Sequence, residues 1–113
     1  MVTIEGLKQF GANVEEGIAR CAGNEGLYLR LVGMIRDEKN FGKLSEAIEE
    51  NDLEKAFEAA HALKGVLGNL SLTPLYEKSS EITELLRARK EADYPALLQE
   101  LQELKQEFDS LLD

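Results

Sequence analysis

The sequence predicts an all-α fold, an antiparallel four-helix bundle with a short N-terminal helical cap. Apolar residues recur along most of the chain at steps of three and four, which is the period of one helix face. The composition is 43% hydrophobic and includes only two prolines, both near expected helix starts. The 113 residues support a single domain with its own core. Within it, residues 1–23 are expected to form the cap and residues 24–113 the bundle.

The cap is predicted to contain two short helical segments. The first is a lead-in whose apolar residues are Ile4, Leu7 and Phe10. The second begins after Asn13, because Asn13 followed by Glu16 resembles a capping box. The stretch Cys21-Ala22-Gly23-Asn24 ends that segment, and Asn24 can cap the helix that follows.

The segment from Glu25 carries a long apolar stripe with a period of 3.6 residues. Its members are Leu27, Tyr28, Leu31, Val32, Met34 and Ile35, followed in nearly the same phase by Phe41, Leu44 and Ile48. The pattern fits one long helix or two helices separated around Asn40-Phe41-Gly42. Core packing is favoured for Leu31, Met34 and Phe41 over an exposed docking patch. Asn51-Asp52 marks the next turn, with Asp52 as the expected N-cap.

Three more helices complete the predicted bundle. One is expected from Leu53 to about Leu70. The next begins at Thr73-Pro74, because proline suits the first helical position, and it ends near Lys90. Its apolar side carries Leu75, Ile82, Leu85 and Leu86. Asp93-Tyr94-Pro95 opens the last helix. Apolar residues there alternate steps of four and three, the pattern of a bundle seam, at Leu97, Leu101, Leu104, Phe108 and Leu111.

Composition and charge exclude several classes of protein. The 22 acidic and 13 basic residues give a net charge of −9, so nucleic acid and anionic membrane surfaces are poor partners. No run approaches the roughly 20 apolar residues of a membrane span, and no signal peptide is visible. Cys21 is the only cysteine, which fits a reducing compartment. We therefore expect a cytoplasmic protein, and a monomer because no large extra apolar stripe is present.

The helix expected from Leu53 to Leu70 carries the only histidine of the chain, His61. On a helical wheel, His61 lies about 120° from the centre of the apolar side, so its ring should reach solvent. That apolar side comprises Leu53, Ala56, Ala60, Leu63 and Leu67. Lys64, Gly65 and Gly68 follow His61 by three, four and seven residues, so they share its side of the helix.

These neighbours distinguish His61 from an ordinary surface histidine. Each glycine in a helix interior costs roughly 1 kcal/mol relative to alanine, and Gly65 and Gly68 leave the backbone bare beside the imidazole. Another protein could approach closely there. Lys64 offers an ammonium to a phosphoryl group on the ring. An exposed imidazole is largely neutral at pH 7 and can act as a nucleophile. Glu54 and Glu58 lie on the same side, where a solvated acidic face is the favoured interpretation.

The sequence around the histidine resembles a known family. His61-Ala62-Leu63-Lys64-Gly65, continued by Val66-Leu67-Gly68-Asn69-Leu70, is similar to the signature of histidine-containing phosphotransfer (HPt) domains. The resemblance extends from about Gly17 to Leu112, and Met1–Ala12 matches no motif. Ser71 departs from the pattern, because many members have glycine after the Asn-Leu or Asn-Ile pair.

The resemblance implies a role for each residue of the predicted site. His61 would be the phosphorylated residue, and Lys64 the positive charge beside the phosphoryl group. Gly65 and Gly68 would leave room for a docking receiver domain. Family members relay phosphoryl groups between receiver-domain aspartates in two-component phosphorelays. The partners that the resemblance implies are receiver domains, including that of a hybrid sensor kinase. Family members have no kinase activity of their own, and the sequence contains no nucleotide-binding glycine loop.

The same resemblance implies that the chain itself holds no cofactor, because the receiver would supply Mg²⁺ and an acidic pocket. With one histidine and no cysteine cluster, no metal site is expected on this chain. The alternative function is a non-catalytic helical adaptor that binds a signalling partner through the same surface. A self-sufficient enzyme is the weakest hypothesis, because the carboxylate pairs show no sign of a shielding pocket.

Overall fold

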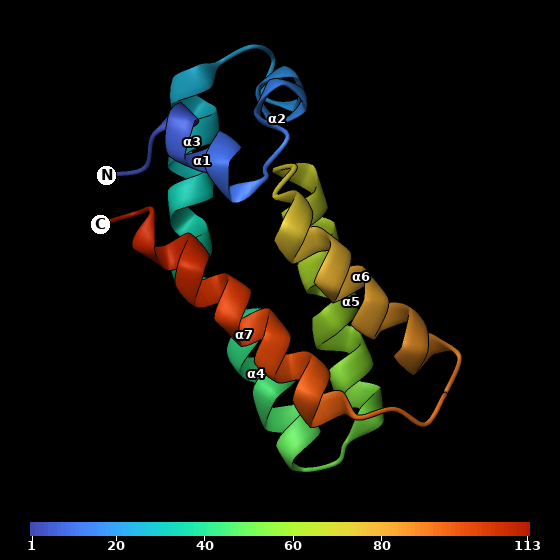
Figure 1. Ribbon diagram of the computed structural model, residues 1–113. Coiled ribbons are helices and arrows are strands. Elements are labelled where there is room, and N and C mark those ends of the chain that lie inside the picture. The colour runs from blue at the N-terminus through green and yellow to red at the C-terminus, as the bar shows by residue number, and fades with distance from the viewer.

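The computed structural model describes all 113 residues, and every regular element in it is helical (Figure 1). The elements are α1 (Ile4–Phe10), α2 (Val14–Arg20), α3 (Glu25–Gly33), the 3₁₀-helix η1 (Met34–Asp37), α4 (Lys39–Glu49), α5 (Leu53–Asn69), α6 (Thr73–Arg87) and α7 (Tyr94–Ser110). Helices α4 to α7 pack side by side, joined by short connections that make successive helices antiparallel. The predicted all-α bundle is confirmed.

Most helices begin at the predicted caps. The Asn24 side chain accepts a hydrogen bond from the backbone N–H of Leu27 at 2.9 Å. Asp52 and Asp93 do the same at the starts of α5 and α7, each at 3.1 Å. These bonds satisfy backbone donors that have no partner within the helix. Helix α6 has no such side-chain cap, and Pro74 occupies its first turn instead.

The long apolar stripe after Glu25 is divided between two helices, and the break lies earlier than the expected Asn40-Phe41-Gly42. The backbone leaves the helical conformation at Glu38, where ψ is 118°. The Glu38 carboxylate accepts hydrogen bonds from the Asn40 backbone N–H at 2.9 Å and from its side-chain amide at 3.1 Å. The break was misplaced because a glutamate supplies the cap, a role that Asn, Asp, Ser and Thr usually fill.

The core runs through the bundle and under the cap, and it includes most of the apolar positions that the sequence predicted. Two residues that were predicted to lie in the core are exposed instead. Leu53 is 42% exposed because it is the first residue of α5, at the end of the bundle, and Ala59 is buried on that helix instead. Met34 is 64% exposed because it lies in η1, where the 3₁₀ turn changes the phase of the stripe.

None of the helices combines the length and the apolar character needed to cross a membrane.

Helices α1, α2 and α3 lie at the end of the bundle that contains the connection between α5 and α6 (Figure 1). The buried Tyr28 hydroxyl donates a hydrogen bond to the Leu70 carbonyl at 2.9 Å. The Asn13 backbone N–H donates to the Ser71 carbonyl at 2.9 Å, and the Ser71 hydroxyl donates to Glu16 Oε1 at 2.8 Å. These bonds fix α2 and α3 against the turn that follows the histidine helix.

Candidate functional site

His61 lies midway along α5, on the side that faces away from the core. Four residues on the opposite side of the helix are fully buried, namely Ala56, Ala60, Leu63 and Leu67. The His61 side chain is exposed. A long helix anchored by its buried side therefore presents the imidazole to solvent on a rigid support.

The imidazole is held by an aromatic neighbour from the preceding turn. The rings of Phe57 and His61 are stacked, with centroids 5.7 Å apart and planes 13° from parallel. The Arg87 guanidinium of α6 lies 5.1 Å from the centroid of the Phe57 ring, which is cation–π distance. The stack restricts the orientation of the His61 ring while leaving the histidine open to solvent.

Lys64 lies one turn beyond His61 and is linked to α6 through a carboxylate. Its ammonium is 3.3 Å from Glu84 Oε2, and Arg87 Nε is 3.2 Å from Glu84 Oε1. The hydrogen bond from Lys64, with a further contribution from Arg87, holds the pKa of the Glu84 carboxyl below its usual value. Contacts between α5 and α6 thus form a continuous chain that runs from His61 through Phe57, Arg87 and Glu84 to Lys64.

The two glycines on the histidine face have different surroundings. A Cβ atom at Gly65 would meet nothing within 4 Å, so the backbone there faces open space. A Cβ atom at Gly68 would lie 3.1 Å from two atoms of the Tyr76 ring. Gly68 therefore has a neighbour within the chain, which the sequence pattern did not indicate.

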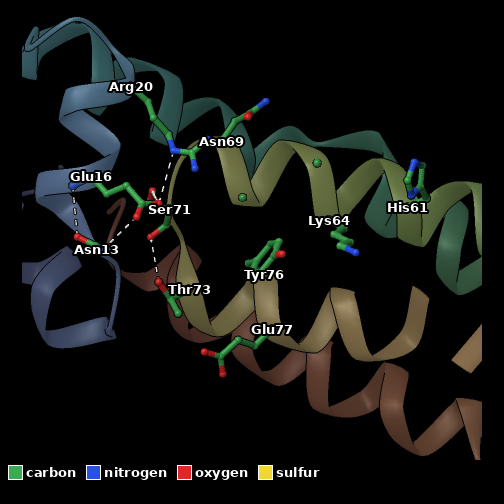
Figure 2. Close-up of a pocket in the computed structure, with 12 residues that line it drawn as sticks. Asn13, Glu16, Arg20, His61, Lys64, Asn69, Ser71, Thr73, Tyr76 and Glu77 are labelled. Atoms are coloured by element: carbon green, nitrogen blue, oxygen red, sulfur yellow. Dashed lines mark hydrogen bonds and ion pairs between the residues drawn. The ribbon is translucent and has the colours of Figure 1, made fainter. Parts of the chain in front are cut away.

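A polar groove of about 600 Å³ extends along this face from the histidine to the cap (Figure 2). His61 and Lys64 lie at one end of it, and the side chains from α2 lie at the other. Its remaining lining residues are Asn13, Glu16, Arg20, Gly65, Gly68, Asn69, Ser71, Thr73, Tyr76 and Glu77. Arg20 Nε is 3.5 Å from Glu16 Oε1 at the cap end. The sequence indicated the α5 side of this groove, whereas the contributions of α2 and α6 emerge only from the fold.

A second groove, of about 570 Å³, lies beside the first turns of α5 and includes Phe57 in its lining. Its lining residues are Leu53, Glu54, Phe57, Glu58, Leu86, Arg87, Arg89 and Tyr94. Glu54 and Glu58 enter none of the ion pairs in the structure, in agreement with a solvated acidic face.

Fold and site together define a helical-bundle protein that carries an exposed histidine on the face of a central helix. The chain belongs to the Hpt domain family, because the family's model matches residues 37–113, which include all of α4 to α7. The match begins at Asp37, so the resemblance expected from Gly17 to Arg36 lies outside it. Hpt domains take part in histidine phosphotransfer in phosphorelays and interact with receiver domains. No curated protein and no solved structure matches the chain.

Proposed function

We propose that this chain is a phosphoryl carrier, in which His61 accepts a phosphoryl group from a receiver-domain aspartate and passes it to a second receiver. The observation that carries the proposal is the placement of His61, exposed on α5 beside Lys64 and the open backbone of Gly65, in a member of the Hpt domain family. No other histidine is present to take this role.

In the proposed reaction an unprotonated imidazole nitrogen of His61 attacks the phosphorus in line. The N–P bond forms as the P–O bond to the aspartate breaks, and the aspartate leaves as a carboxylate. The reverse reaction on another receiver returns the imidazole to its free form. The receiver supplies Mg²⁺ and the acidic pocket, and this chain contributes the nucleophile without a cofactor or kinase activity of its own.

The neighbours of His61 support this chemistry. The Lys64 ammonium is close enough along the helix to neutralise charge on the phosphoryl oxygens. Gly65 gives a receiver close access to the backbone, and Gly68 contributes to the same surface together with the Tyr76 ring. We further propose that the protein acts as a cytoplasmic monomer and that a hybrid sensor kinase can carry one of its receivers.

The first prediction concerns the phosphorylated residue. When the protein is incubated with phosphorylated receiver domains, we expect it to gain a label that is acid-labile and base-stable, and we expect His61→Gln to gain none. Far-ultraviolet circular dichroism and thermal unfolding of His61→Gln serve as the control for folding. The proposal fails if the wild-type protein takes no label from any donor or if His61→Gln labels equally well. Receiver binding without labelling would favour the adaptor function.

A further inference from the structure

The ammonium of Lys64 already has a partner in the unphosphorylated protein. It lies 3.3 Å from Glu84 Oε2, and the Lys64 side chain is only 27% exposed. Glu84 reaches it from α6, across the interface between the two helices. A phosphoryl group on His61 would need the same ammonium, so Glu84 and the phosphoryl group compete for one cation.

Glu84 also has a second partner, so its carboxylate stays in an ion pair when the Lys64 ammonium leaves. Arg87 lies three residues later on α6, and its Nε is 3.2 Å from Glu84 Oε1. The Glu84 side chain is 50% exposed, so water can replace the ammonium on its free oxygen. A phosphoryl group carries about −1.5 to −2 charges at pH 7, against −1 for a carboxylate. The phosphoryl group therefore attracts Lys64 more strongly than Glu84 does.

Resting on the proposed function, we infer that Glu84 is a positioning residue that holds Lys64 while His61 is free and releases it when His61 is phosphorylated. Arg87 keeps Glu84 paired in both states. Because the Lys64–Glu84 ion pair must break each time the phosphoryl group arrives, the phosphorylated form is less stable than it would be with Lys64 unengaged. Glu84 thereby keeps the phosphoryl group transferable.

The experiment uses phosphoramidate, so that it needs no partner protein. The P–N bond of phosphoramidate breaks as the N–P bond forms on His61, and ammonia leaves, so the reaction is reversible. With phosphoramidate and ammonium at fixed concentrations, ³¹P NMR gives the concentration of phosphohistidine. The ratio of phosphorylated to free protein then follows from the total protein concentration. We expect Glu84→Gln to raise this ratio about twofold to fivefold, the range that an exposed ion pair supports.

Two controls separate the ion pair from a general effect of charge. Glu81→Gln removes the same charge from the same helix, at a residue whose Oε1 lies 2.8 Å from the Lys78 ammonium, and should leave the ratio unchanged. In a Lys64→Gln background, Glu84→Gln should also have no effect, because no ammonium remains to be released.

The outcomes distinguish this inference from the proposed function. If His61 is phosphorylated but Glu84→Gln does not change the ratio, or changes it equally without Lys64, the positioning role of Glu84 is wrong and the carrier function stands. If His61 takes no label from phosphoramidate or from any receiver, the carrier function is wrong and the inference falls with it.

Discussion

Gly65 and Gly68 both lie on the histidine face, but their substitution by alanine is expected to affect the stability of the protein in different ways. Gly65→Ala should raise the free energy of unfolding by up to about 1 kcal/mol, because alanine favours the helix and its Cβ meets no neighbour. Gly68→Ala should give no gain or a loss, because the Tyr76 ring, 3.1 Å from the added Cβ, must move. Urea unfolding of both variants measures the difference. Equal stabilisation by the two substitutions would contradict this account.

The same Gly65→Ala variant bears on docking. If a receiver approaches the bare backbone, the added methyl group should slow phosphoryl transfer from a receiver while phosphoramidate still labels His61. Stability and transfer would then change in opposite directions, which a purely structural role for Gly65 does not predict.

At the residue scale, the sequence predicts which side chains share one face of α5, but not which side chains reach that face from another helix. His61, Lys64 and Gly65 share one helix, so their common face follows from the 3.6-residue period. Glu84 and Tyr76 could not be assigned to the site, because they reach it from α6. The spacing of Glu84 and Arg87 predicts an ion pair between those two residues, and it carries no information about Lys64 on another helix.

At the scale of elements, the packing of α2 against α3 depends on Gly17. A Cβ at this position would lie 2.3 Å from Cε1 of the buried Tyr28 ring. Gly17→Ala should therefore displace α2 and destabilise the protein by about 1–3 kcal/mol, despite the better helix propensity of alanine. Thermal unfolding measures the loss. Gly26→Ala is the control, because its nearest neighbour is the Asn24 side chain at 3.6 Å, an ordinary contact. The account is wrong if the two variants are equally stable.

Most of the helices and their starts were predictable, whereas the junction between α3 and α4 was not. The apolar period places α5, α6 and α7, together with the side-chain caps of α5 and α7 and Pro74 at the start of α6, since all these signals are local. The start of α4 depends on the Glu38 carboxylate, and nothing in the apolar pattern changes there.

Ser71 is a second position whose residue type the sequence alone does not explain. Its φ of 53° is in the left-handed region that favours glycine. The hydrogen bond from its hydroxyl to Glu16 offers a reason for serine that only the tertiary contact reveals.

At the scale of the whole molecule, helices α1, α2 and α3 are joined to the bundle of α4 to α7 by buried contacts. The Tyr28 hydroxyl bond to the Leu70 carbonyl crosses this junction, and it ends on the turn that follows the histidine helix. Since α2 also lines one end of the groove, any loosening of the junction would alter the surface beside His61. Global stability and the shape of the candidate site are therefore coupled through Tyr28.

Titration of the Tyr28 phenol is expected to lower the stability of the protein at alkaline pH. Burial, with a smaller effect of Cys21, raises the pKa of Tyr28 from 10.0 to about 12. Below pH 10 the phenol is protonated in folded and unfolded chains, and its contribution to stability is fully present. Between pH 10 and 12 the unfolded chain releases the proton while the folded chain retains it, so stability falls as the pH rises. The loss approaches about 2–3 kcal/mol once the pH passes 12.

Comparing the wild-type protein with Tyr28→Phe isolates this contribution. At pH 9 the variant should be less stable by about 1 kcal/mol, because the hydrogen bond to Leu70 is lost. Urea unfolding at pH 9 and at pH 11.5 should show the wild-type advantage shrinking or reversing, because phenylalanine has no proton to lose. The pKa of Lys78 is also raised, first by its hydrogen bond to Glu100, but that contribution falls equally in both proteins and cancels. Parallel losses of stability in the two proteins would show that titration of the Tyr28 phenol does not lower the stability at alkaline pH.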